Sequence, residues 1–473
     1  MNRSISKMSR NLTSLMGQRS RSGRRWAPYS ALVVIAMAGT MIPNLNKAAA
    51  SFGVMRTSNP HRLTEASRHP GHVPNLTTQS VYLGPMPPHE LMHMTVAFQI
   101  VDPAGVQNAI DDMYNPGSSR FHQWLTPQQF GDQFGRSSDE LTEARGWLSA
   151  QGFTIDQVWA NRLAISFTGE VAGVERAFNV TIGRYRDEQR NLVFYSNNSD
   201  PVLPPELSTI TEELRGLENG NRYQTDKFNV VRKLSEDEVK RQIRAQARRS
   251  SNALIGTPPT FFLGPADLQL AYDITDPATA APVSNPGKGQ VAAIIIDSGL
   301  TTSDIIQYRE VLGLPPANVK QVTIPGVPTP PQSIDLESAL DYGAISCMAP
   351  DAEIVFVLAP ELSFAQVFAA EQYCVNTLMP TAVNESFGNC EVEAFSSAEQ
   401  ALFQQAVLEG VAFVASAGDD GQQCFSNGFD SGIAMLNCPV CYDTVTAAGG
   451  TQYAQPVVAA SGVLLGGPDE QVW

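Results

Sequence analysis

Histidine and basic residues are scarce in the C-terminal half of this 473-residue chain. All six histidines lie at or before His122, so catalysis further along must proceed without a histidine base. That excludes a Ser-His-Asp triad there and leaves carboxylates to move protons. Residues 257–473 hold three basic and 24 acidic residues, a net charge of −21; the whole chain carries −15, which leaves +6 for residues 1–256. Such an acidic segment excludes nucleic acid as a partner and favours an acidic working environment.

Long apolar runs are absent after the first 50 residues, and we therefore predict no membrane span. Within residues 1–50, a basic region containing Arg24 and Arg25 precedes a short apolar stretch, 31–41, and a small-residue cleavage site before Ser51. This pattern is typical of a signal peptide. We expect the protein to be secreted (extracellular).

Six cysteines lie between positions 347 and 441. An even number in an exported chain predicts disulfide bonds. Cys438-Pro-Val-Cys441 could serve redox or metal chemistry. The chain offers no second such pair and no βαβ start before it, so a structural bridge is the preferred interpretation.

Residues from about 75 to 223 predict a separate α+β unit that ends near Pro201, Pro204 and Pro205. Ser137 with Glu140 predicts a capping box at the start of one helix. We find no nucleophile motif, metal cluster or phosphate loop in this unit. The predicted strands are 92–101, 163–167, 181–185 and 192–195, and the predicted helices include 104–114 and 171–178.

A polar, basic linker follows at 224–256, which is either a plain spacer or a region cleaved during maturation. Beyond it, apolar strand patterns alternate with helical ones, and such alternation predicts a parallel sheet covered by helices on both faces. Parallel sheets bind ligands at the carboxyl ends of their strands. The predicted strands are 291–296, 354–358 and 411–415, and the predicted helices are 303–312, 364–378 and 396–408.

Two carboxylates, Glu337 and Asp341, lie four positions apart in a helical pattern. On a helix this spacing places them on one face, about 6 Å apart. One interpretation is a solvated helix face. The other is a functional pair that moves protons.

Four motifs follow one another in the first unit: Asn115-Pro-Gly-Ser-Ser119, Phe121-His-Gln-Trp-Leu-Thr-Pro127, Ser166-Phe-Thr-Gly169 and Val174-Glu-Arg-Ala-Phe178. In this order they resemble the prosegment of the sedolisin (serine-carboxyl) peptidases. The opening of the second unit, Pro265-Ala-Asp-Leu-Gln-Leu-Ala-Tyr272, is similar to the start of their catalytic domains. The resemblance implies an α+β prosegment with an antiparallel sheet over 51–223, which assists folding and inhibits the enzyme. It also implies an α/β, subtilisin-like catalytic domain over 257–473, incomplete at its C-terminus.

The same resemblance implies catalytic roles. Glu337-Ser-Ala-Leu-Asp341 is similar to the family's Glu-x-x-Leu-Asp motif, in which Glu337 would be the base and Asp341 its supporting acid. Asp419, in Gly418-Asp-Asp-Gly421, would be protonated and would donate to the oxyanion. A carboxylic acid donates only when it is neutral, so this chemistry suits low pH.

The segment Asn384-Glu-Ser-Phe-Gly388 resembles the family's substrate-binding segment, whose backbone pairs with the substrate chain. The resemblance implies that Ser386, Phe387 and Gly388 bind substrate. Asn384 stands where the family usually has a serine.

Two further predictions concern residues near the expected strand ends. Asp297-Ser-Gly299 is similar to the Asp-x-Gly of subtilisins, but the absence of a histidine partner favours a structural role for Asp297. Cys390 and Cys424 each follow an expected active-site strand by a few residues, and we predict that they form a disulfide bond.

The family's nucleophile, a serine in a Gly-Thr-Ser motif, does not occur in these 473 residues, and its calcium site is expected later still. Three interpretations remain: a precursor of a secreted acid endopeptidase that uses calcium, of which these residues are a part; an inactive truncation product; and a non-catalytic secreted protein that inhibits or chaperones a peptidase. The expected partners are a protein or peptide substrate and the chain's own prosegment. We expect a monomer with no assigned metal ligands, no nucleic acid and no membrane partner.

Overall fold

In the computed structural model, the described residues are 67–225, 265, 283–327, 336–418 and, with gaps, 423–472 (423–426, 429–453, 457–458, 464–466 and 470–472). The described residues 67–225 and 283–450 belong to one compact unit, and residue 265 and the described residues of 451–472 belong to another. The unit that contains residues 451–472 has two described antiparallel strand pairs. One is β20 (Thr451–Tyr453) with β23 (Glu470–Val472), and the other is β21 (Val457–Val458) with β22 (Leu464–Gly466). No described helix combines the length and the apolar character that a membrane span requires.

The first domain (67–225) is built on two antiparallel sheets. The larger has the strand order β4-β5-β3-β9 and the smaller the order β2-β6-β7. Alternation along β3 turns Met92, Met94 and Val96 into the main core, where they meet apolar residues of α5 and α6. The strands are β2 (Val81–Pro85), β3 (Leu91–Phe98), β4 (Thr154–Val158), β5 (Ala164–Glu170), β6 (Ile182–Asp187), β7 (Leu192–Asn197) and β9 (Thr211–Arg215), with the short pair β1 (Ser67–Arg68) and β8 (Val202–Leu203).

The helices of this domain begin with polar caps. The capping box predicted at Ser137 and Glu140 is confirmed, and a second one forms between Thr126 and Gln129. Each box satisfies amide hydrogens that the first helical turn leaves without partners. The helices are α2 (Asn75–Gln79), α3 (Pro103–Met113), α4 (Pro127–Phe134), α5 (Ser138–Ala150), α6 (Val171–Phe178) and α7 (Pro205–Ser208).

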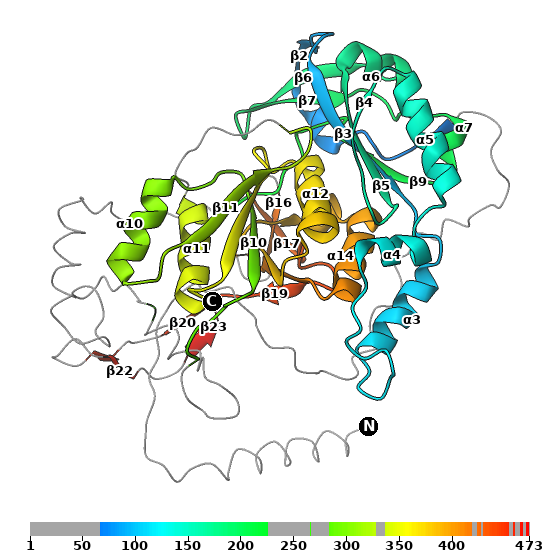
Figure 1. Cartoon of the computed structure of the whole chain (residues 1–473). Helices are drawn as coiled ribbons and strands as arrows, with labels where there is room; N and C mark the ends of the chain where they lie inside the picture. Colours follow the sequence, from blue (N-terminus) through cyan, green and yellow to red (C-terminus); the bar gives the residue numbers. More distant parts are fainter. Residues whose placement is uncertain are drawn as a thin grey trace, which may run out of the picture. The chain divides into compact units, whose positions relative to one another are not determined.

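The second domain (283–450) is organised around a parallel sheet of six strands in the order β11-β12-β10-β13-β15-β19 (Figure 1). Every pairing in it is parallel, which confirms the predicted α/β sheet. The strands are β10 (Val291–Ile296), β11 (Asn318–Thr323), β12 (Glu353–Leu358), β13 (Ala382–Glu385), β15 (Ala412–Ser416) and β19 (Thr446–Ala448).

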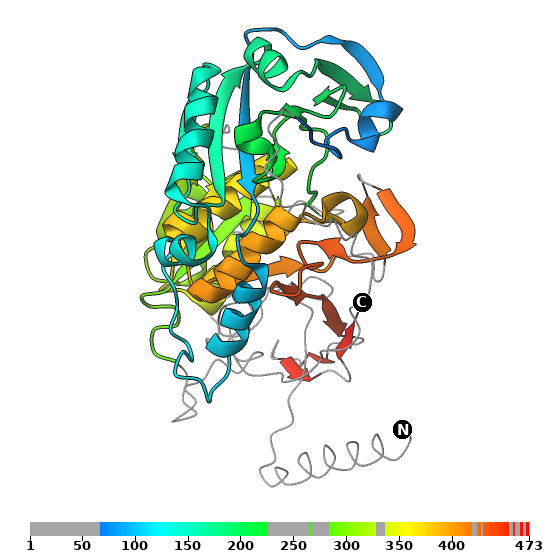
Figure 2. The ribbon, with the colours of Figure 1, turned by 90° about the vertical axis from the view of Figure 1, so that its right-hand side faces the viewer.

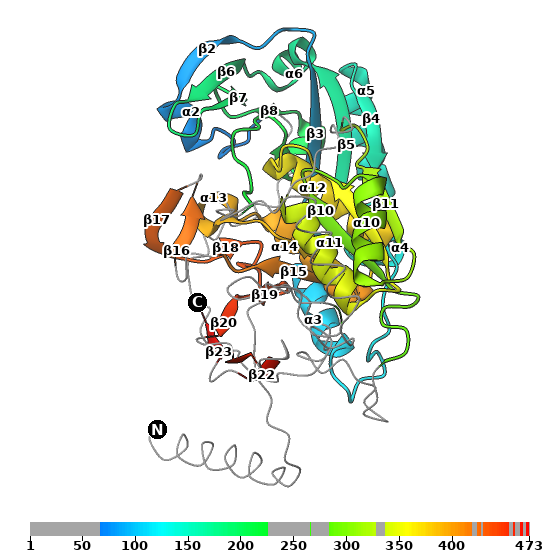
Figure 3. The ribbon, with the colours of Figure 1, turned by 90° about the vertical axis from the view of Figure 1, so that its left-hand side faces the viewer.

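Helices cover both faces of this sheet. Along β10, Ile294 and Ile296 pack with α10 and α11, whereas Ala293 and Ile295 pack with α12 and α14 on the other face (Figures 1 and 3). A parallel sheet buried on both faces needs such continuous apolar strands. The helices are α10 (Thr302–Leu312), α11 (Leu336–Met348), α12 (Phe364–Tyr373), α13 (Glu391–Ala394) and α14 (Ser397–Glu409).

Several local features differ from the sequence-based expectation. The predicted helix over 364–378 is α-helical only to Tyr373, and its last turn is the π-helix η1 (Cys374–Leu378), which ends at Met379 with φ of 47°. The edge strand β11 was not predicted. Nor were the antiparallel hairpin of β16 (Gln423–Ser426) and β17 (Phe429–Ala434), and the pair β14 (Asn389–Cys390) and β18 (Asn437–Cys438).

The two domains contact each other through α14. Figure 2 shows α3, in cyan, beside α14, in orange. The Tyr114 hydroxyl donates to the Val407 carbonyl (3.3 Å), and the Leu125 amide donates to the Leu408 carbonyl (2.9 Å). Asn161 of the first domain, fully buried, donates through Nδ2 to Gln405 Oε1 (2.8 Å) on the same helix. This interface fixes the first domain against the helical layer on one face of the parallel sheet.

Candidate active site

The predicted acid pair lies at the start of α11, the helix that leads into β12. Glu337 is 5% exposed and Asp341 is 6% exposed. The interpretation of a solvated helix face is therefore wrong. Burying two carboxyl groups is costly unless polar partners surround them, so the pair lies in a specialised environment.

Ser386 supplies one such partner, because it follows β13 at the carboxyl edge of the sheet. Its Oγ donates to Asp341 Oδ1 at 2.7 Å and accepts a hydrogen bond from Asn384 Nδ2 at 3.2 Å. Side chains alternate along a strand, so Asn384 and Ser386 share the face that meets α11. The structure thus brings together the acid pair and the segment that were predicted separately.

A second contact fixes α11 against the sheet. The hydroxyl of Ser338, which follows Glu337, donates to the Ser298 carbonyl at 2.7 Å. Ser298 and Asp297 form the turn that follows β10. The turn that contains Asp297 therefore lies next to the first turn of α11, which carries the acid pair.

The remaining two predicted substrate residues have different surroundings. Phe387 is fully buried, and its ring centroid lies 5.1 Å from that of Tyr223. The backbone of Gly388 pairs with Gln224, since each amide donates to the other's carbonyl (3.0 and 3.1 Å). The chain that leaves the first domain thus forms a short antiparallel bridge with the segment predicted to hold substrate.

Asp419, the predicted oxyanion residue, lies outside the described residues. Its neighbour Gly418 has a φ of 93°, and a Cβ there would lie 2.5 Å from Asn437 Nδ2. Glycine is therefore required at the start of this turn. Asn437 also donates to the Ala417 carbonyl (3.2 Å), a role for which the sequence offered no signal.

Both predicted disulfide bonds are confirmed. Cys390 is bonded to Cys424, with 5.0 Å between their Cα atoms, and Cys438 is bonded to Cys441. The first bond links the segment after Gly388 to β16. Cys347 and Cys374 are buried thiols.

Calcium, which the family resemblance implies, has no evident ligand set in the part of the chain that the structure describes. No group of three or more histidine, cysteine, aspartate or glutamate side chains there could hold a metal ion. Calcium binds through several oxygen ligands at once. We therefore assign no step to a metal.

The chain is similar in sequence to a known activation domain and to several peptidases. Residues 78–219 match the activation domain of pro-kumamolisin. The chain is 25% identical over 377 residues to sedolisin of Pseudomonas sp. (strain 101), covering 76% of this chain and 60% of that protein. It is 27% identical over 359 residues to kumamolisin of Bacillus sp. (strain MN-32), covering 74% and 59%. It is 25% identical to xanthomonalisin of Xanthomonas sp. (strain T-22), covering 72% and 41%.

The chain also matches a solved structure of Pseudomonas sedolisin, a serine-carboxyl proteinase complexed with pseudo-iodotyrostatin. The matched region covers 40% of this chain and 54% of the sedolisin chain. The sequence identity is 24% and the TM-score 0.34. The sequence matches confirm the resemblance of this chain to sedolisin-family precursors. It spans about three fifths of the length of sedolisin and kumamolisin and about two fifths of xanthomonalisin.

Proposed function

We propose that the chain is the precursor of a secreted serine-carboxyl endopeptidase that hydrolyses peptide bonds at acid pH. The observation that carries the proposal is the buried cluster of Glu337, Asp341 and Ser386 at the carboxyl edge of the parallel sheet. Ligands of parallel-sheet proteins bind at this edge. The cluster holds no histidine, so a carboxylate is the group available to take a proton.

In the proposed reaction, a serine hydroxyl attacks the peptide carbonyl, the C–N bond breaks, and the amine leaves with the proton that the base took from the hydroxyl. Water then hydrolyses the resulting acyl-enzyme and regenerates the serine. Glu337 removes the hydroxyl proton, and Asp341 holds Glu337 in place; Ser386 in turn fixes Asp341 through its hydrogen bond. Protonated Asp419 donates to the oxyanion. The family's Gly-Thr-Ser motif, which would supply the attacking serine, does not occur in residues 1–473.

The first domain acts as an inhibitory prosegment in this proposal. Two backbone hydrogen bonds join Gln224 to Gly388, the glycine proposed to pair with a substrate backbone. A peptide substrate would form such bonds by adding a strand to the same edge. The segment at the end of the first domain therefore competes with substrate until it is removed.

The test is hydrolysis of an unfolded protein by the native secreted product at pH 4 and pH 7. We expect activity at pH 4, and a loss of roughly 100-fold or more in Glu337→Gln, which removes a general base. Glu310→Gln, on the exposed side of α10, is the matched control and should keep activity. Equal activity of Glu337→Gln and Glu310→Gln would refute the assignment.

A second candidate is a non-catalytic inhibitor or chaperone of a peptidase, which the Gln224–Gly388 bridge also favours. Here the native product shows no hydrolysis at either pH. The full chain added to an active sedolisin-type peptidase then slows that enzyme. Absence of both hydrolysis and inhibition would contradict both candidates.

A further inference from the structure

A single arginine of the first domain enters the helical layer of the second domain. Arg215 ends β9, and its side chain is 4% exposed. Its Nη1 donates to Glu399 Oε1 (2.7 Å) and to the Phe364 carbonyl (2.8 Å), and its guanidinium carbon lies 4.4 Å from the centre of the Phe368 ring. Its Nε lies 3.1 Å from Glu213 Oε2. The guanidinium thus has acceptors along its edge and an aromatic ring on its face.

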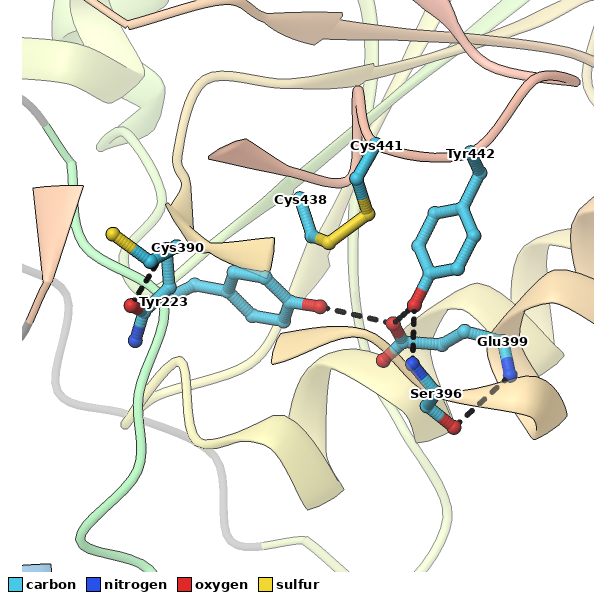
Figure 4. The surroundings of a disulfide bond; sticks show 8 residues. Tyr223, Cys390, Ser396, Glu399, Cys438, Cys441 and Tyr442 are labelled. Carbon is cyan, nitrogen blue, oxygen red and sulfur yellow. Dashed lines mark hydrogen bonds between the residues drawn. A yellow bond between two sulfur atoms is a disulfide. The ribbon is translucent and has the colours of Figure 1, made fainter. Parts of the chain in front are cut away.

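Glu399 is held in place by groups other than the arginine. Its Oε2 accepts hydrogen bonds from the hydroxyls of Tyr223 (3.0 Å) and Tyr442 (2.7 Å), and Figure 4 shows both rings converging on it. The Ser396 amide donates to the Tyr442 hydroxyl at 2.9 Å, which fixes that ring in turn. Tyr442 and Ser396 belong to the second domain, so this part of the arrangement orients the carboxylate without help from the first domain, as a preorganised site requires.

Glu399 pairs with Arg215, whereas two other buried carboxyl groups near Glu399 favour the neutral form. Two further carboxyl groups, those of Glu371 on α12 and Glu385 on β13, are fully buried nearby. Burial, and then the neighbouring Glu399, raise the pKa of each well above its usual value, so both favour the neutral form. Burial alone would lower the pKa of Arg215, but Glu213 and Glu399 hold it above its ordinary value.

We infer that α12 and α14 form a guanidinium-binding pocket, made by Glu399, Phe368 and the Phe364 carbonyl, and that Arg215 is the ligand supplied by the first domain. The site does not depend on peptidase activity. An ammonium group fits less well, because it lacks the planar face that contacts the Phe368 ring. The pocket therefore selects an arginine side chain and joins the two domains through it.

Chemical rescue of the full chain tests this inference. Arg215→Ala empties the pocket, and we expect its thermal unfolding temperature to fall by roughly 10 °C, since one partner of a buried ion pair is lost. Methylguanidinium should reverse much of this fall, with half of the effect at about 1–10 mM, a range set by its five heavy atoms. Methylammonium at the same concentrations should not.

Two controls make the result specific. Arg190→Ala removes a buried arginine that pairs with Asp187 inside the first domain, and methylguanidinium should not rescue it. Arg215→Ala combined with Glu399→Gln should lose the rescue, because the anionic acceptor is gone. Equal rescue by both cations, or equal rescue of Arg190→Ala, would overturn the inference.

If Arg215→Ala does not fold, Arg215→Lys decides the question. It keeps the positive charge but loses the planar group. We expect its unfolding temperature to lie several degrees below that of the wild type. An unchanged unfolding temperature would show that charge alone suffices and would overturn the assignment of a guanidinium site.

Discussion

Two groups of buried carboxyl side chains flank strand β13 on its opposite faces. On the α11 face, Asp341 accepts a hydrogen bond from the hydroxyl of Ser386. On the other face, Glu399 accepts hydrogen bonds from two tyrosines and from the guanidinium of Arg215. Glu385 and Ser386, adjacent in sequence, belong to the two different groups because side chains alternate along a strand.

The two groups differ in the origin of their partners. The described hydrogen bond to Asp341 comes from a neutral hydroxyl of the same domain. Glu399 is tied to a cation that only the first domain supplies. The first arrangement suits acid–base chemistry, and the second suits attachment of one domain to another.

The largest expected effect lies on the Arg215 face. Arg215→Met leaves Glu399 buried without its cation, so we expect a loss of about 3–5 kcal/mol in the free energy of unfolding. Glu399→Gln should also destabilise. The double variant should lose less than the sum, with a coupling of at least about 1 kcal/mol, as expected for residues in direct contact. Urea unfolding of the four proteins measures the coupling; strict additivity would mean that the ion pair does not stabilise the folded chain.

A buried carboxyl group further along α14 sharpens the comparison. Glu409 is 5% exposed, and the amide of Gln405 donates to its Oε1 at 2.7 Å. Its Oε2 has no hydrogen-bond partner among the described residues. Burial raises the pKa of Glu409 to about 8. Glu409 thus shows how a carboxyl group on this helix behaves with an amide partner in place of a guanidinium.

The pH dependence of stability follows from that pKa. Below pH of about 4.5, Glu409 is protonated in both folded and unfolded chains and contributes no difference. As the pH rises to about 8, the unfolded chain loses the proton and the folded chain keeps it, so the folded chain is progressively destabilised. Glu409→Gln should remove a loss of about 2–4 kcal/mol over this range and match the wild type near pH 4.

Urea unfolding at several pH values measures this difference. Glu310→Gln, an exposed residue of α10, controls for removal of one charge. If the difference between wild type and Glu409→Gln stays constant from pH 4 to 8, Glu409 does not titrate in this range.

The sequence predicted elements well where local patterns are strong. Helix α6 (Val171–Phe178) and strand β10 (Val291–Ile296) have the bounds that were expected, since α6 carries a helical apolar period and β10 is a continuous apolar run. Strand β11 was missed because it is an edge strand, exposed or half-buried along its length and marked by polar residues. Local signals of this kind do not reveal pairing with a distant strand.

The candidate site was predictable only in part, for the same reason. The spacing of Glu337 and Asp341 revealed a pair, but their burial and the contact with Ser386 depend on a fold that joins positions 45 residues apart. The contact between Arg215 and Glu399 joins positions 184 residues apart, and no local motif marks either residue. The motif that contains Phe387 suggested a backbone contact with substrate, but nothing local indicated that its side chain lies in the core.

The smallest expected effect lies on the α11 face, where Ser386→Ala removes one hydroxyl. The change takes away the donor to Asp341 and the acceptor for Asn384, so we expect a loss of about 1–2 kcal/mol in urea unfolding. Ser386→Thr keeps a hydroxyl and should recover part of it.

Combined with Arg215→Met, the loss from Ser386→Ala should be unchanged within about 0.5 kcal/mol, because the two groups share no described hydrogen-bond partner. A larger deviation would contradict the independence of the two faces. It would show that docking of the first domain is felt at Asp341 through the peptide that joins Glu385 to Ser386, and the acid pair and the arginine pocket would then form one coupled unit.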